Sequence, residues 1–256
     1  KFYNQKLRMK ISILLPYKEN FSPNYPGAVS LFVNDTLKLS KFKKKVKVYG
    51  NTHYKEKFSK NYKNIKLKKT FFGSQSENYM DEFIKMEKEN SSSIIEIHNR
   101  PHYLKYLINE GIKSKFVLYF HNDPLTMTGS KSLSERKYLV DICEKIIFNS
   151  LWSKKRFLEN IKSGSVSSEK LIVIFQSASK NKINLNKKKK WITFVGKLNR
   201  SKGYDIFGAA VIKILNKYKE WQAIVIGDEQ RDKIFFQHER LKTLGFLDHN
   251  KVINIF

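Results

Sequence analysis

Two histidine-containing tetrapeptides stand directly after mainly apolar segments of the chain. His-Asn-Arg-Pro at 98–101 follows residues 94–97, and His-Asn-Asp-Pro at 121–124 follows residues 116–120. Such apolar segments predict buried parallel strands, and open parallel sheets bind ligands at the carboxyl ends of their strands. The residues expected to contact a polar substrate are therefore His98, Arg100, His121, Asn122 and Asp123.

A structural role is the alternative for several residues of these tetrapeptides. Pro101 fixes a turn and a helix start, Asn99 can bond the local backbone, and Asp123 can cap the turn that follows it. A metal site is not expected, because His98 and His121 lack a third ligand at helical or hairpin spacing.

A glycine-bearing basic loop forms a second group of residues suited to chemistry. The apolar residues 191–195 lead into Gly196 and Lys197, and a helix-length segment follows Lys202 and Gly203. A helix start presents unpaired N–H groups and the positive end of the dipole, so it binds anions readily. With two lysines and two glycines that admit a bulky ligand, the loop suits a diphosphate. The alternative is an ordinary turn whose lysines are solvated.

This loop resembles a known signature. Phe-Val-Gly-Lys-Leu-x-x-x-Lys-Gly-x-Asp at 194–205, followed by Ile-Val-Ile-Gly-Asp at 224–228, is similar to the donor site of the retaining GT-B glycosyltransferases of family four, glycosyl transferases group 1. The resemblance implies that Lys197 and Lys202 hold the diphosphate of a nucleotide sugar and that His121 contacts the sugar. Lys197 departs from the arginine usual in the family, and Glu229 stands where a second glycine is common.

The resemblance completes the predicted site. It implies three catalytic residues, His121, Lys197 and Lys202. Pro-Gly-Ala at 26–28 is the nearest match to the family's glycine-rich loop near the substrates, and Gly227 closes the second apolar strand of the signature. No cofactor and no metal are expected, because the nucleotide-diphosphate sugar is itself the donor substrate. The predicted substrate-binding residues are Gly27, His98, Arg100, Asn122, Asp123, Gly196, Gly203 and Gly227.

The apolar segments and the helix-length segments that must position these residues predict an α/β protein, and the resemblance implies the GT-B fold, with two Rossmann-like domains built on parallel sheets. We expect an acceptor-side domain at 1–180, a lysine-rich linker at 181–190, and the start of a nucleotide-sugar domain at 191–256. Its tail is expected to form a helix after residue 237 and a final strand at 251–256. Two glutamates that relatives carry further on have no match here, so the second domain is expected to be incomplete and the chain a fragment.

Composition narrows the possible partners. The chain has 256 residues and a formal net charge of +27, with lysine spread over its whole length. Nucleic acid is not expected as a partner, because no zinc spacing and no RNA-recognition motif occur. The runs at 41–45 and 60–69 interleave lysines with apolar residues, which favours peripheral contact with an anionic membrane. A single cysteine, Cys143, excludes an internal disulfide and fits a reducing compartment.

The function implied by the resemblance is transfer of a sugar, with retention, from a nucleotide-diphosphate donor to a glycan or lipid-linked acceptor in bacterial surface polysaccharide synthesis, such as that of lipopolysaccharide. The expected location is the cytoplasm or the inner face of the membrane. Three alternatives stay open: a degenerate, non-catalytic GT-B binding protein, a basic protein that binds membrane or nucleic acid, and a sugar epimerase. The epimerase is disfavoured because no Gly-x-Gly-x-x-Gly follows the first apolar segment.

Overall fold

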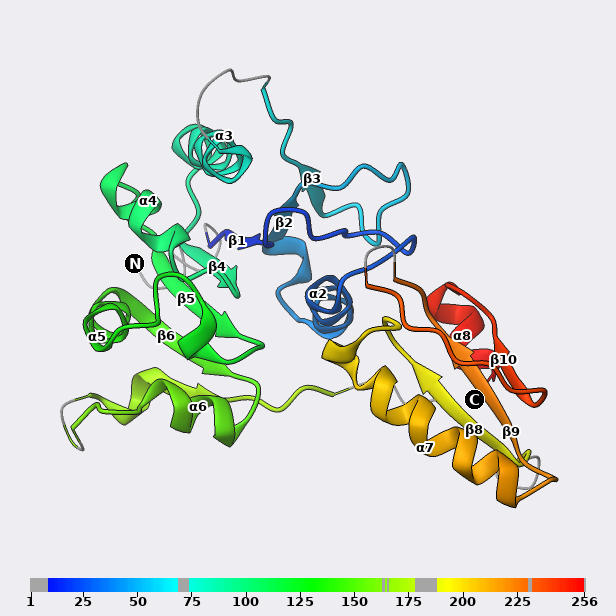
Figure 1. Ribbon diagram of the computed structural model, residues 1–256. Helices are drawn as coiled ribbons and strands as arrows, with labels where there is room; N and C mark the ends of the chain where they lie inside the picture. The colour runs from blue at the N-terminus through cyan, green and yellow to red at the C-terminus, as the bar shows by residue number, and fades with distance from the viewer. Residues whose placement is uncertain are drawn as a thin grey trace. The chain divides into compact units, whose positions relative to one another are not determined.

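The computed structural model describes residues 9–68, 74–162, 164, 166–177, 188–229 and 232–255 (Figure 1). The chain forms two compact units, unit 1 at Lys1–Ser179 and unit 2 at Lys180–Phe256. Most of the linker predicted at 181–190 lies outside the described residues.

Unit 1 is built on a seven-stranded sheet in which every pair of neighbouring strands is parallel. The strand order is β3-β2-β1-β4-β5-β6-β7, so the direction of winding reverses between β1 and β4. Ligands of such sheets bind at this reversal, outside the carboxyl ends of the strands. The strands are β1 (Ile11–Leu14), β2 (Val46–Gly50), β3 (Tyr62–Asn64), β4 (Ile94–His98), β5 (Lys115–Phe120), β6 (Cys143–Phe148) and β7 (Leu171–Val173).

Helices cover both faces of this sheet. The larger apolar core joins one face to α3, α4, α5 and α6, and a smaller core joins the other face to α2. Ser74 and Ser132 begin α3 and α5 with capping boxes, which satisfy backbone N–H groups at the helix starts. The helices are α2 (Ala28–Leu39), α3 (Gln75–Glu89), α4 (Tyr103–Asn109), α5 (Leu133–Ile142) and α6 (Leu151–Phe157), with 3₁₀ turns η1 (Lys43–Lys45), η2 (Pro124–Thr126) and η3 (Ser168–Lys170).

Two aromatic residues of α6 differ in burial. Phe157 is fully buried, whereas Trp152 is 57% exposed. Trp152 lies one residue into α6, and its ring packs beside the guanidinium of Arg156 instead of the sheet. Cys143 is buried, and burial raises the pKa of its thiol to about 12, which keeps the thiol protonated.

Unit 2 contains a three-stranded parallel sheet in the order β10-β9-β8. Its elements are β8 (Trp191–Val195), η5 (Arg200–Lys202), α7 (Tyr204–Lys217), β9 (Gln222–Ile226), β10 (Leu241–Thr243) and α8 (His249–Ile255). The apolar face of α7 packs on this sheet through Tyr204, Val211 and Leu215, which gives the predicted β-α-β unit.

The two elements predicted for the tail are wrong. A strand, β10, stands where a helix was expected, because the backbone of Leu241–Thr243 pairs with the open edge of β9. A helix, α8, stands where the final strand was expected, although its sequence contains β-branched residues. Propensity of this kind is a weak preference that context overrides, and the Lys251–Asp248 ion pair at spacing i,i+3 supports the helix.

The structure predicts an unequal response of two glycines in unit 2. A Cβ on Gly227 would lie 1.8 Å from the carbonyl oxygen of Gly196, and its φ is 138°. We expect Gly227→Ala to lower the free energy of unfolding by about 3 kcal/mol. Gly245→Ala, at φ 72° with open space around the Cβ, should cost about 1 kcal/mol. Denaturant unfolding followed by tryptophan fluorescence measures both, and equal losses would contradict this packing.

Candidate functional site

His98 and His121 lie side by side at the carboxyl ends of β4 and β5. Their rings stack with centroids 5.1 Å apart, and His98 Nδ1 lies 2.8 Å from His121 Nε2. The other nitrogen of His98, Nε2, lies 2.7 Å from Glu96 Oε1, and His121 Nδ1 lies 2.6 Å from the amide nitrogen of Gln176. The four side chains therefore form one continuous hydrogen-bonded chain.

Two asparagines hold the backbone of His121. Asn99 has a left-handed φ of 52°, and its Oδ1 accepts a hydrogen bond of 2.8 Å from the His121 N–H. Asn149 donates its side-chain amide to the His121 carbonyl at 2.8 Å. The side chain of Asn99 thus bonds a backbone group 22 positions away instead of the local backbone, and in doing so it fixes His121.

The surroundings of His121 keep its ring neutral. Tyr119 stacks on His98, and Phe32 of α2 meets the His121 ring edge-on with centroids 5.0 Å apart. Burial, reinforced by the neighbouring His98, lowers the pKa of His121 to about 3. A neutral imidazole donates one hydrogen bond and accepts one, so His121 suits hydroxyl groups better than phosphates.

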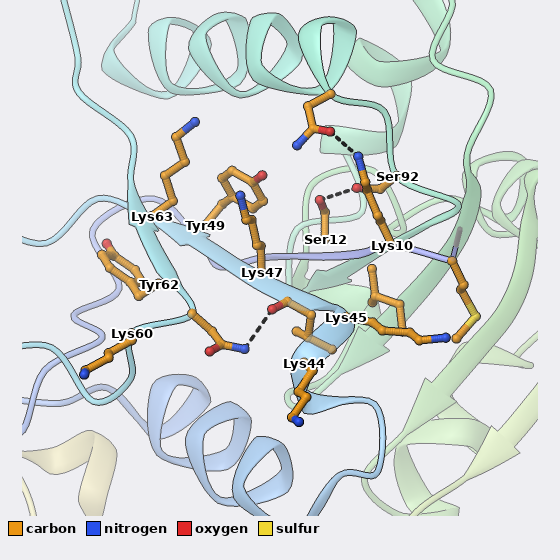
Figure 2. A pocket seen from close by; sticks show the side chains of 15 residues that line it. Lys10, Ser12, Lys44, Lys45, Lys47, Tyr49, Lys60, Tyr62, Lys63 and Ser92 are labelled. Carbon is orange, nitrogen blue, oxygen red and sulfur yellow. Dashed lines mark hydrogen bonds between the residues drawn. The ribbon is translucent and has the colours of Figure 1, made fainter. Parts of the chain in front are cut away.

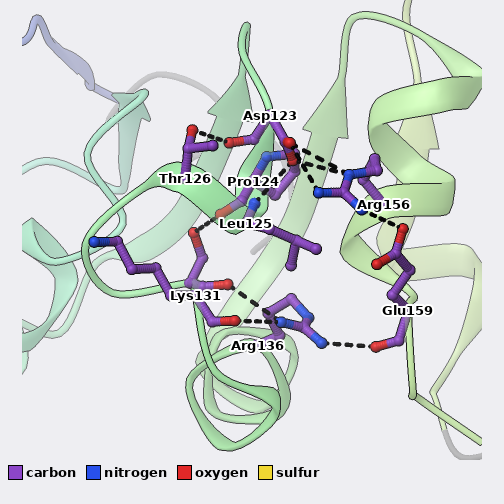
Figure 3. A network of polar contacts seen from close by, with 9 residues as sticks. Asp123, Pro124, Leu125, Thr126, Lys131, Arg136, Arg156 and Glu159 are labelled. Atoms are coloured by element: carbon purple, nitrogen blue, oxygen red, sulfur yellow. Dashed lines mark hydrogen bonds and ion pairs between the residues drawn. The ribbon is translucent and has the colours of Figure 1, made fainter.

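Asp123 belongs to a different set of contacts (Figure 3). Its Oδ1 accepts from the Leu125 N–H at 3.0 Å, and its Oδ2 accepts from Arg156 Nη2 of α6 at 3.1 Å. Arg156 also pairs with Glu159 at 2.5 Å. Both carboxylate oxygens of Asp123 are thus engaged in capping η2 and tying it to α6, which favours the capping alternative over contact with a substrate.

The other predicted residues of unit 1 differ in accessibility. Asn122 is exposed, while Arg100 is half-buried and donates to the Asn99 carbonyl. Gly27 precedes α2, where the carboxylate of Glu19 accepts from the Ser30 N–H at 2.9 Å. An anion at this helix start would have to displace Glu19.

In unit 2 the predicted glycines meet at the carboxyl ends of β8 and β9. The Gly196 N–H donates to the Ile226 carbonyl at 3.0 Å, and the close approach of Gly227 leaves no room for a side chain. Gly203 adopts the left-handed conformation, with φ 72°, immediately before α7. These positions require glycine for backbone reasons.

The two predicted lysines of the loop differ in their contacts. Lys202 is exposed, whereas Lys197 lies 3.5 Å from the carboxylate of Glu229, which also accepts from Asn199 at 2.9 Å. Asp205, at the start of α7, keeps one buried carboxylate oxygen without a hydrogen bond. An arriving diphosphate would exchange places with Glu229 on Lys197.

Sequence reasoning missed three residues of these sites as members, namely Glu96, Gln176 and Glu229. Glu96 stands two positions before His98 on the same strand, and this spacing places both side chains on one face of the sheet. That signal was available in the sequence. Gln176 comes from the segment after β7, and no local pattern links it to His121.

The described residues contain neither a candidate membrane-spanning helix nor a candidate metal-binding cluster. Across the described ranges, no helix has both the length and the apolar character needed to cross a membrane. Within the same residues, His, Cys, Asp and Glu side chains form no group of three or more that could hold a metal ion.

Comparison with known proteins identifies the fold. No protein-family model and no curated protein matches the sequence. Solved structures do match: sucrose-phosphate synthase from Thermosynechococcus elongatus has a TM-score of 0.67 and 11% identity, over 95% of this chain and 72% of that chain. HepE of Anabaena, in complex with UDP and glucose, has a TM-score of 0.58 and 15% identity, over 93% of this chain and 70% of that chain.

A third structure broadens the comparison. It is the structure of a protein from Listeria monocytogenes with a proposed identity as a UDP-N-acetylglucosamine 2-epimerase. It has a TM-score of 0.54 and 12% identity, over 96% of this chain and 71% of that chain. Identities this low show the fold alone. The fold is the expected α/β GT-B type with Rossmann-like parallel sheets, and proteins described as a galactosyltransferase and as an epimerase share it.

The depressed pKa of His121 predicts a pH dependence of stability. Its value of about 3 lies below the ordinary 6.5, so protons bind preferentially to the unfolded chain between these values. We expect His121 to reduce stability as the pH falls from 6.5 towards 3, and to have no such effect above 6.5.

Urea unfolding at several pH values tests this dependence with the variant His121→Asn. Burial also lowers the pKa of His102, so the wild-type curve contains a second contribution and only the difference between the two proteins is diagnostic. The variant should lose stability less steeply below pH 6.5. Parallel curves would show that His121 titrates normally.

Proposed function

We propose that the protein is a retaining glycosyltransferase that moves a sugar from a nucleotide-diphosphate donor to a hydroxyl of a glycan or lipid-linked acceptor. The loop between β8 and α7 in unit 2 carries this proposal: Gly196 and Gly227 pack closely at the strand ends, Lys197 follows Gly196, and Lys202 immediately precedes Gly203, the N-cap of α7. The capture of UDP and glucose by HepE, which has the same fold, supports a nucleotide sugar as the ligand.

In the proposed reaction, the bond between the sugar and the diphosphate breaks and negative charge develops on the leaving group. Lys197, Lys202 and the N–H groups at the start of α7 stabilise this charge. The acceptor hydroxyl attacks from the face that the diphosphate leaves and passes its proton to the departing diphosphate oxygen, so retention needs no protein nucleophile. His121 contacts the sugar as a neutral group, and no metal takes part.

Removal of the loop lysines should weaken nucleotide binding. A hydrogen bond to a charged group contributes roughly 1.5–3 kcal/mol, so Lys197→Ala and Lys202→Ala are each expected to weaken UDP binding about tenfold or more. Lys213→Ala, an exposed lysine within α7, is the matched control and should leave the affinity unchanged. Calorimetric titration of UDP measures the three variants, and equal affinities in all of them would overturn the assignment of this loop.

Product analysis separates the proposed transferase from the other proteins of this fold. Incubation with UDP-glucose and a mixture of glycan acceptors, followed by NMR of the products, should show a new glycoside with the anomeric configuration of the donor. An altered sugar nucleotide formed without any acceptor would identify an epimerase. Binding without turnover would identify the non-catalytic protein.

The proposal also includes peripheral contact of the protein with an anionic membrane surface. A groove of about 950 Å³ lies at the amino-terminal ends of β1, β2 and β3, away from the histidine edge (Figure 2). Its described lining contains no Asp or Glu, and six of its fifteen residues are lysines: Lys10, Lys44, Lys45, Lys47, Lys60 and Lys63. In the segment that leads to Lys44, Leu39 is 90% exposed and Phe42 is 39% exposed, so the same stretch of sequence carries exposed apolar and basic side chains.

Charge reversal in this groove tests the membrane proposal. Each lysine near an anionic bilayer contributes about 1 kcal/mol, so the double variant Lys44→Glu, Lys47→Glu should bind vesicles containing phosphatidylserine at least tenfold more weakly. Lys137→Glu with Lys213→Glu carries the same net charge on two exposed helix positions and should bind nearly as the wild type. Equal losses in the two double variants would mean that overall charge, not the groove, drives binding.

A further inference from the structure

The hydrogen-bonded chain through His121 has only one direction that satisfies every member. The Gln176 amide nitrogen only donates, so His121 Nδ1 must accept and His121 Nε2 must carry the proton. His121 Nε2–H then donates to His98 Nδ1, and His98 Nε2–H donates to the Glu96 carboxylate, which only accepts. A donor at one end and an acceptor at the other therefore agree on the same tautomer of both rings.

The Glu96 end of this hydrogen-bonded chain is held in place by the fold. His98 is fully buried, and its ring stacks on both Tyr119 and His121. Glu96 and His98 both lie in β4 and are two residues apart, so the strand fixes their spacing. Because neither nitrogen of His98 is free, this ring is placed to orient His121 and not to touch a substrate itself.

The end at Gln176 is the replaceable one. Gln176 is exposed and lies beyond the end of β7, whereas His121 is held by its backbone N–H, its backbone carbonyl and Nε2. A ligand that reaches His121 therefore meets Nδ1, and it must offer a donor in place of the Gln176 amide.

We infer that Glu96 and His98 are positioning residues that fix the Nε2–H tautomer of His121, so that its Nδ1 lone pair accepts a hydrogen bond from a sugar hydroxyl that displaces Gln176. This inference rests on the proposed function for the identity of the ligand. It also sets a chemical requirement on the ligand. The group that reaches Nδ1 must donate a hydrogen bond, as a sugar hydroxyl does, because a group that only accepts leaves the Nδ1 lone pair without a partner.

The tautomer can be measured directly, without a ligand. Long-range ¹⁵N–¹H correlation spectra of the whole chain with labelled histidine identify the protonated nitrogen of each ring. We expect protons on Nε2 of both His98 and His121. A proton on Nδ1 of His121 would overturn the inference.

Three variants locate the origin of the tautomer. Glu96→Leu removes the final acceptor and should give mixed tautomers of both rings, whereas Glu96→Gln keeps an acceptor oxygen and should restore the wild-type spectrum. Gln176→Ala, at an exposed position, should leave His121 with its proton on Nε2. Loss of the Nε2–H tautomer in Gln176→Ala would show that Gln176 determines it. A wild-type spectrum in Glu96→Leu would show that Glu96 does not determine the tautomer of either ring. Glu96→Gln and Gln176→Ala decide the point if Glu96→Leu fails to fold.

Titration with UDP and UDP-glucose tests the ligand. Glu96→Leu should weaken UDP-glucose binding about tenfold and leave UDP binding unchanged, since the lost contact involves only the sugar. Equal losses of UDP binding and UDP-glucose binding would overturn the assignment of the sugar contact to His121. Failure of UDP itself to bind would overturn the proposed function, while the tautomer spectra would still decide the role of Glu96 and His98.

Discussion

The parallel direction of all seven strands in unit 1 is the constraint on which the candidate site depends. It brings the carboxyl ends of β4, β5 and β6 to one edge, where Asn99, His121 and Asn149 follow their strands and bond to one another. The same geometry stacks His98 on His121 and aligns the chain that ends at Glu96. Strand direction and register therefore bring the residues of the site together, and contacts with buried side chains fix the orientation of His121.

The two units present opposite electrostatic characters at their predicted sites. Burial keeps His121 neutral and directs a lone pair towards a ligand, which suits the uncharged part of a nucleotide sugar. Lys197 and Lys202 lie in an exposed loop and suit its diphosphate. Glu229 holds Lys197 when no anion is bound, so the loop carries less unpaired positive charge than its sequence suggests. The proposed transfer reaction uses both kinds of group, the neutral imidazole for the sugar and the lysines for the diphosphate.

Most of the fold could be predicted from the sequence because the strands are apolar and glycine or proline residues mark many of the turns. The parallel direction of the strands, the β-α-β unit and the two histidine loops all follow from local patterns. The tail was wrong because the open edge of β9 recruits Leu241–Thr243 as a strand, and this depends on a partner distant in sequence. For the same reason, no pattern linked Gln176 to His121 or Glu229 to Lys197. The engagement of Asp123 by Arg156, 33 positions away, likewise needed the structure.

A structure of the chain crystallised with UDP-glucose tests the central claim most directly. The account predicts diphosphate oxygens about 3 Å from the ammonium groups of Lys197 and Lys202, with the Glu229 carboxylate displaced from Lys197. A nucleotide bound elsewhere, or one that leaves the Glu229–Lys197 ion pair intact, would contradict it.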